Sequence, residues 1–110
     1  MYTHAQRVKE PEVQELRKAA GVLLKSLREQ QRLSQRQLAE LVGVEYYSFI
    51  SQLETGRGRI PPDRSEVWAE ALGVEVRPLA KAMLFYYDPI TYRHLFGDDI
   101  PELTVPLAQP

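Results

Sequence analysis

Residues 33–56 limit more strongly than any other stretch what this chain can fold into, because they place a glycine between two short helical patterns. Ser34 precedes a periodic apolar run. Gln37 follows Ser34 by three residues, which is the spacing of a capping box at the start of a helix. Apolar residues then recur at the spacing of one helical face, namely Leu38, Leu41 and Val42. Gly43 can adopt the left-handed conformation that ends a helix. The pattern therefore predicts a short helix that stops sharply.

A second helix is predicted after this turn, since Phe49, Ile50 and Leu53 repeat the helical spacing. Its other face is polar and almost uncharged, and consists of Tyr47, Ser48, Ser51, Gln52 and Thr55. A solvated helix face usually carries Lys and Glu, whereas hydroxyls, an amide and aromatic rings suit the reading of hydrogen-bond donors and acceptors on base edges. We interpret the two helices as a helix-turn-helix unit that binds DNA.

The whole chain has 110 residues, which is enough for one domain with a modest core. It has no cysteine, and it has no apolar run of membrane-spanning length. His4 and His94 lack the spacing of metal ligands, and no nucleophile with an adjacent base or pair of carboxylates stands out. We expect a soluble, cytoplasmic and nucleoid-associated protein that is not an enzyme and that uses no cofactor and no metal.

Charge is segregated along the chain, although the formal net charge is only −1. Residues 17–59 hold eight basic against four acidic side chains, which gives +4. Residues 60–110 hold four basic against eight acidic side chains, which gives −4, and residues 1–16 carry −1. A basic surface backed by an acidic one would orient the protein on DNA.

Helical periodicity extends on both sides of this unit. The first helix starts near Glu12 and places four apolar residues on one face, namely Leu16, Ala20, Leu24 and Leu27. Gly21 interrupts this helix and suggests close approach of a neighbouring helix. Leu23 lies off this face. It could form a second contact surface, or it could be an ordinary exposed leucine.

Three further helices are predicted. One opens at Pro62, ends at Gly73 and carries Trp68, which we assign to the core rather than to a ligand site. The others span residues 76–87 and 90–96. The domain organisation expected is a flexible arm at 1–11, a DNA-binding domain at 12–74, C-terminal helices at 75–97 and an extended acidic, proline-containing tail at 98–110.

Three motifs in order resemble the lambda-repressor-like family of helix-turn-helix proteins, of the Cro and XRE type. They are Gly21-x-x-Leu24-x-x-Leu27-Arg28, Leu33-Ser34-Gln35-x-x-Leu38-Ala39 and Ile50-Ser51-Gln52-Leu53-Glu54-x-Gly56. The resemblance covers roughly residues 20–74. It implies an all-α bundle of about five helices, to which the chain adds a short C-terminal helix. It also implies a structural ion pair between Arg28 and Glu54.

Two departures from the family pattern affect the site. The family usually has glycine where Arg32 stands, so either this turn differs or Arg32 is strained there; its charge could face a phosphate or solvent. The segment between Gly43 and Glu54 is also one residue longer than in most relatives. Aligning on Glu54 makes the recognition helix about Tyr47–Thr55, which we prefer, whereas aligning on Gly43 would move Glu45 and Tyr46 into the groove.

The expected partner is double-stranded DNA. The predicted contact residues are Gln35, Arg36, Tyr46, Tyr47, Ser48, Ser51, Gln52, Thr55, Arg57 and Arg59. Gln52 is the first choice for base specificity, because its amide can pair bidentately with adenine. One of Tyr46 and Tyr47 should pack on the turn while the other meets DNA. Arg57 and Arg59 lie in a glycine-rich loop that suits phosphate binding, the alternative being a solvated basic loop.

The C-terminal helices are too apolar for one buried face. We therefore expect a homodimer through Leu79, Met83, Leu84, Phe85, Tyr87, Tyr92 and Phe96. The alternative is that the sixth helix folds back over the fifth within one chain. A different function on the same fold, that of an antitoxin or protein-interaction module, would use these helices as a surface for a protein partner.

Overall fold

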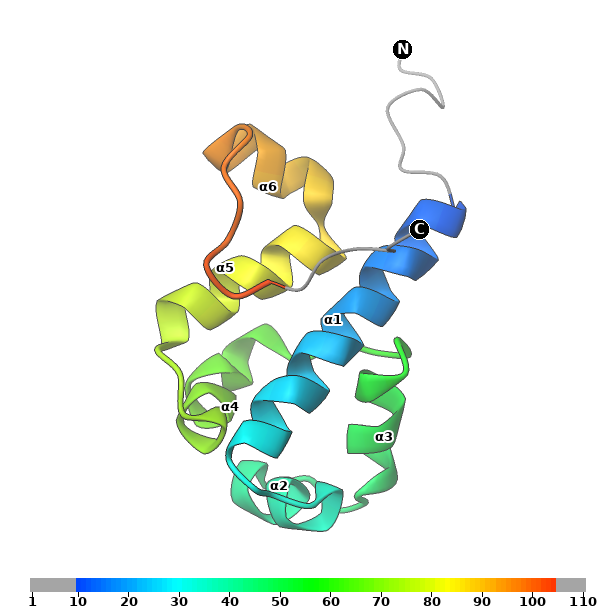
Figure 1. Ribbon diagram of the computed structural model, residues 1–110, viewed down its shortest axis with the longest axis vertical. Coiled ribbons are helices and arrows are strands. Elements are labelled where there is room, and N and C mark those ends of the chain that lie inside the picture. Colours follow the sequence, from blue (N-terminus) through cyan, green and yellow to red (C-terminus); the bar gives the residue numbers. More distant parts are fainter. Residues whose placement is uncertain (1–9, 105–110) are drawn as a thin grey trace.

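A computed structural model describes residues 10–104, and all regular secondary structure in this part of the chain is helical (Figure 1). Its helices are α1 (Glu10–Gln30), α2 (Gln35–Val42), α3 (Ser48–Glu54), α4 (Ser65–Leu72), α5 (Val76–Tyr87) and α6 (Pro89–Phe96), with a 3-10 turn at Pro62–Arg64 before α4. The prediction of an all-α bundle with a short additional C-terminal helix is confirmed. None of the described helices is long and apolar enough to cross a membrane.

Local side-chain bonds explain where two of the helices begin. The backbone N–H of Gln37 donates to Ser34 Oγ at 3.0 Å, and the N–H of Ser34 donates to Gln37 Oε1 at 2.8 Å, so the capping box of α2 is complete. At the start of α6 the N–H of Thr91 donates to Asp88 Oδ1 at 3.2 Å. Gly43 ends α2 in the left-handed conformation, with φ of 79°.

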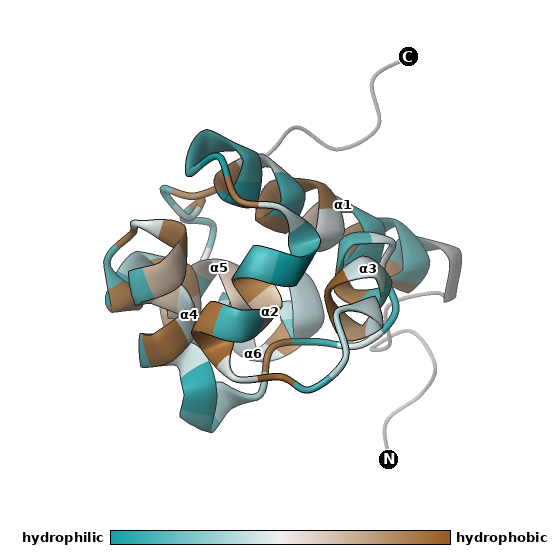
Figure 2. Ribbon diagram, turned by 90° about the horizontal axis from the view of Figure 1, so that it is seen from below, coloured by the Kyte–Doolittle hydropathy of each residue, from teal (hydrophilic) through white to brown (hydrophobic). Residues whose placement is uncertain are grey.

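The core lies between α1 and the remaining helices (Figure 1). α1 packs on α3 and α5, α2 packs on α3 and α4, and α6 packs on α5. Seen from below, α2 lies in front between α4 and α3 (Figure 2). The largest fully buried side chains are Trp68 and Tyr86, so Trp68 fills the core as predicted.

Two of the apolar residues point in directions that the sequence did not indicate. Leu23 is only 4% exposed and belongs to the core, so it is not an ordinary exposed leucine but widens the contact surface of α1. Leu41 is 56% exposed, because α2 turns Leu38, Ala39 and Val42 inward instead. Leu41 therefore does not share the buried face on which it was placed.

Gly21 allows α3 to approach α1 closely. A Cβ atom at Gly21 would lie 2.6 Å from the carbonyl carbon of Glu54 and 2.8 Å from the carbonyl oxygen of Leu53. A Cβ at Gly56, which follows α3, would lie 3.1 Å from the backbone nitrogen of Lys18. The expected close approach at Gly21 is therefore between α1 and α3.

The turn between α1 and α2 keeps the left-handed residue that the family pattern places there. Arg32 has φ of 58°, and it is the only non-glycine residue with positive φ in the described part of the chain. The turn itself therefore does not differ, and arginine occupies a conformation that costs an L-residue about 1–2 kcal/mol.

The C-terminal segment folds back onto α5. Residue Leu103 packs against the core, and the hydroxyls of Tyr86 and Thr104 are 3.0 Å apart. The described part of the tail is thus laid across its own chain. The remainder, residues 105–110, and residues 1–9 of the predicted arm lie outside the described residues, while residues 10 and 11 belong to α1.

The expected dimer surface needs correction. Four of its seven residues are buried within the single chain, namely Leu79, Met83, Tyr87 and Tyr92. α5 packs on α1, α4 and α6, and Tyr92 of α6 packs edge-on against Phe85 with ring centroids 5.1 Å apart. Only Leu84, Phe85 and Phe96 retain exposed area for a second copy.

Candidate nucleic-acid interface

The second helix of the pair, α3, begins at Ser48 with Tyr47 as its N-cap and ends at Glu54 with Thr55 as its C-cap. These bounds agree with the alignment on Glu54. The extra residue lies in the turn, where Glu45 is exposed and outside any helix. Ile50 is buried, and so is Leu53.

The outer face of α3 is uncharged. Ser48 and Gln52 are exposed, and Ser51 is half-buried. Thr55 Oγ1 donates to the carbonyl oxygens of Ser51 and Gln52, and lies 3.1 Å from each of them. Thr55 therefore ends the helix and can offer DNA only its acceptor lone pairs, whereas Ser48 and Gln52 have donors and acceptors available.

Arginine and tyrosine stack at the N-terminal end of α3. The guanidinium of Arg36, on α2, lies over the Tyr47 ring at 4.4 Å from the centroid. Tyr47 is 44% exposed and Tyr46 is 67% exposed, so both rings reach the surface, and the ring of Tyr47 packs on Arg36. The stack holds a cation beside the N-terminus of α3, where a DNA phosphate would be attracted.

Glu54 joins three elements through a buried ion pair. Arg28 Nε donates to Glu54 Oε2 at 2.6 Å, and Arg28 Nη2 donates to Oε1 at 3.0 Å. The two side chains are 9% and 5% exposed, and Arg28 Nη1 also donates to the Leu33 carbonyl at 2.7 Å. The hydrogen bond with Glu54 raises the pKa of Arg28 above its usual value. The ion pair implied by the family resemblance is thus formed.

Gln35 is committed to the same cluster. Its Nε2 donates to Glu54 Oε1 at 3.0 Å, so the amide points into the protein at the helix pair rather than outward. Gln35 was expected to bind phosphate. In this structure its side chain instead fixes α2 relative to α3.

The loop after α3 places its two arginines differently. Arg57 is exposed, and its backbone N–H donates to the Gln52 carbonyl at 2.8 Å. Arg59 lies over the Tyr87 ring of α5 at 5.2 Å, and Arg17 of α1 lies over the same ring at 6.0 Å. Burial raises the pKa of the Tyr87 hydroxyl, while the two guanidinium groups oppose that shift.

Sequence reasoning missed Arg64, which holds the helix pair against α4. Its Nη2 donates to the Val42 carbonyl at 2.6 Å and so satisfies a free acceptor at the C-terminus of α2. The only sequence signal was a basic residue close after Pro61-Pro62. No group of His, Asp or Glu able to hold a metal occurs among residues 10–104.

Comparison with known proteins agrees with this geometry. No curated protein matches the chain. A family model described as a helix-turn-helix domain matches residues 19–82, which is more than half of the chain and runs from α1 into α5. The chain therefore belongs to the helix-turn-helix domain family.

Proposed function

We propose that this protein is a sequence-specific DNA-binding regulator of transcription that inserts α3 into the major groove. The observation that carries the proposal is the uncharged outer face of α3 between two exposed arginines, Arg36 near its N-terminus and Arg57 after its C-terminus. Membership of a helix-turn-helix family supports DNA as the partner. Base edges would be read by the polar face and phosphates bound at its two ends.

Ser48, Ser51 and Gln52 are assigned to base reading, with Gln52 as the main determinant of specificity. The exposed tyrosines, Tyr46 and Tyr47, extend this surface at the N-terminal end of α3. The buried Arg28–Glu54 pair holds α3 against α1 and lies too deep to meet a base.

Replacement of Gln52 and of Arg57 tests these roles. Gln52→Ala should cost about 1–3 kcal/mol on the preferred duplex and relax the preference at one base pair. Arg57→Ala should weaken binding to all duplexes similarly. The duplex is first obtained by selection from random sequences, and affinities are then measured on selected and scrambled duplexes. Equal losses for both variants on both duplexes would contradict the assignment.

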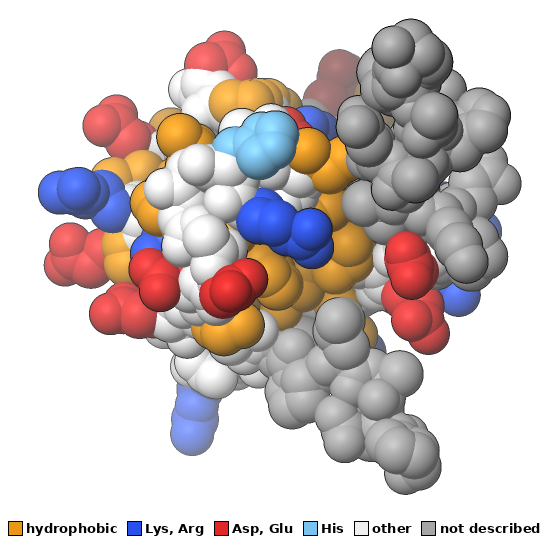
Figure 3. Space-filling model, turned by 90° about the horizontal axis from the view of Figure 1, so that it is seen from above, with side chains coloured by type: hydrophobic (Ala, Val, Ile, Leu, Met, Phe, Trp, Pro, Cys, Tyr) orange, Lys and Arg blue, Asp and Glu red, His pale blue; other side chains and the backbone are white. Residues whose placement is uncertain are grey.

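We also propose that two copies bind a two-fold operator, in the cytoplasm and in association with the nucleoid. The surface left for the second copy combines Phe96 with other exposed apolar residues of α6 and the segment after it, namely Ile90, Leu95 and Ile100. On the face seen from above, exposed hydrophobic side chains lie among acidic and basic ones (Figure 3). Sedimentation of the protein with and without a two-site duplex tests for the dimer.

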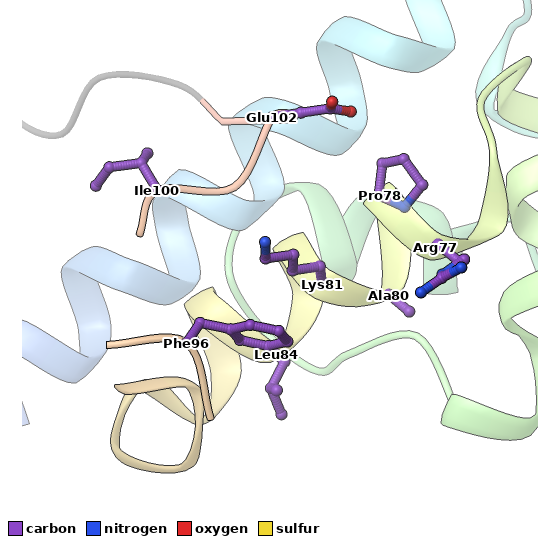
Figure 4. Close-up of a pocket in the computed structure, with 8 residues that line it drawn as sticks. All are labelled: Arg77, Pro78, Ala80, Lys81, Leu84, Phe96, Ile100 and Glu102. Atoms are coloured by element: carbon purple, nitrogen blue, oxygen red, sulfur yellow. The ribbon is translucent and has the colours of Figure 1, made fainter. Parts of the chain in front are cut away.

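A second candidate function is a protein-interaction module, such as an antitoxin, on the same fold. A groove of about 520 Å³ between α5 and the segment after α6 favours it (Figure 4). The groove has apolar walls that include Leu84, Phe96 and Ile100, and Lys81 Nζ lies 4.5 Å from the centroid of the Phe96 ring. Duplex binding that weakens with added salt would favour the regulator, and its absence the interaction module.

A further inference from the structure

Basic side chains converge where the first half of α1 meets the loop after α3. Gly56 packs directly on the backbone of Lys18, and Arg57 follows Gly56 in the chain. Arg17 adjoins Lys18, and it shares the Tyr87 ring with Arg59. Lys18, Arg57 and Arg59 are all exposed. Contacts on three elements therefore bring these cations to one surface at the C-terminal end of α3.

This convergence is not balanced by carboxylates. Within residues 12–104 the only ion pair is that of Arg28 with Glu54, so Lys18, Arg57 and Arg59 have no salt-bridge partner there. Asp88 interacts with the cluster through the charge of Arg59. Bringing like charges together raises the free energy of the protein alone, and an anion bound between them would lower it.

Two buried polar atoms without hydrogen-bond partners lie beside this group of cations. Arg17 Nε and the Tyr87 hydroxyl are buried and have no hydrogen-bond partner. Tyr87 is 9% exposed, and its ring is the common platform of two guanidinium groups. The ring thus fixes Arg59 close to α1 and leaves Arg57 and Lys18 facing outward.

We propose that Lys18 of α1 joins Arg57 and Arg59 in one phosphate-binding patch, which contacts the DNA backbone beyond the base pairs read by α3. The inference rests on the proposed DNA-binding function. α3 has seven residues and is about 10 Å long, which is slightly less than the ~12 Å width of the major groove. Phosphates outside the groove must therefore be contacted by other elements. The patch extends the contact surface past its C-terminus onto α1. For a chain with a net charge of −1, binding to DNA must come from such local concentrations of cations.

The salt dependence of duplex binding tests the patch. Wild-type protein and Lys18→Gln are compared on one random-sequence duplex between 50 and 200 mM salt. Losing one phosphate contact lowers the slope of log affinity against log salt by about 0.9, so the variant's affinity should fall about 3.5-fold less over this range. Lys18→Arg should restore the wild-type slope. Arg77→Gln, on α5 in the groove, is the matched control because it removes the same charge elsewhere.

The outcomes separate this inference from the proposed function. If the wild-type protein shows no salt-dependent duplex binding, the proposed function itself fails. If it binds while Lys18→Gln keeps the wild-type slope, only the patch is excluded. A slope lowered equally by Lys18→Gln and Arg77→Gln would show a general effect of net charge and would also overturn the patch. Unfolding curves of each variant exclude loss of the fold as a cause.

Discussion

Replacing Gly21 with alanine should dislocate α3, because nothing flexible faces the added methyl group. The nearest atoms belong to the backbone of Leu53 and Glu54, and the carbonyl carbon of Glu54 would lie 2.6 Å from the new Cβ. Ordinary contact begins near 3.4 Å, so α3 would have to move by about 0.8 Å. Such overpacking costs about 1–3 kcal/mol, against a gain of up to ~1 kcal/mol from helix propensity.

The expected net loss for Gly21→Ala is about 1–2 kcal/mol, which corresponds to a fall in Tm of roughly 5–15 °C. Duplex affinity should fall with it, since the displaced Glu54 backbone carries the carboxylate that binds Arg28 and Gln35. Val22→Ala is the control, because Val22 is the next residue of α1 and is 55% exposed, so that its truncation should change stability by less than ~0.5 kcal/mol. A Gly21→Ala protein as stable as Val22→Ala would refute the reasoning.

Three further changes probe single interactions by urea unfolding. Arg32→Gly should stabilise the protein by about 0.5–1 kcal/mol, because glycine relieves the strain at φ of 58° at some cost in chain entropy; a loss would contradict this. Glu54→Gln should cost about 3 kcal/mol, since it leaves the buried Arg28 charge unpaired, whereas Glu40→Gln on the exposed surface should be neutral. The bond from Thr91 lowers the pKa of Asp88, so the stabilisation that Asp88→Ala removes should be present above the unfolded pKa of about 3.9. It should shrink as the pH falls through the lower folded pKa, and a difference from wild type that does not decrease with falling pH would contradict it.

Helix ends could be predicted from the sequence because they are set by neighbours a few residues away. Ser34 and Gln37 complete their capping box within one turn, and Asp88 caps α6 in the same way. Gly43 and Gly73 end α2 and α4 in the left-handed conformation, with φ of 79° and 71°. Each of these signals depends on local geometry alone, so no knowledge of the tertiary contacts was needed.

The direction of apolar side chains was harder to predict, because it depends on how many neighbours a helix has. α1 packs on both α3 and α5, so its buried face is wide enough to include Leu23 as well as Leu24 and Leu27. α2 has its neighbours α3 and α4 on one side, so Leu41 is left outside. The surplus apolar residues of α5 and α6 were assigned to a second copy, although Tyr92 and Tyr87 are buried within one chain.

Long polar side chains were the least predictable, because each has several partners within reach. Gln35 could face a phosphate or the protein, and the carboxylate of Glu54 draws it inward. Arg59 could have turned away from the helices, and the Tyr87 ring, over which Arg17 also lies, holds it against α5. Both partners come from distant parts of the chain. A sequence pattern can therefore name such residues as basic or polar, but the fold decides whether they bind a ligand or hold an element in place.

The turn between α2 and α3, in which the family resemblance implies one additional residue, is anchored in the core on both sides. Val42 before the turn and Ile50 after it are each 1% exposed, so both ends are fixed in the core. The N–H of Val44 donates to the Ala39 carbonyl at 3.0 Å, which closes the end of α2. Added chain length can then only bulge outward, and Tyr46 accordingly stands 67% exposed. Because Leu53 stays buried, Gln52 keeps its place on the outer face of α3, and the insertion adds an aromatic ring at the edge of the proposed reading surface.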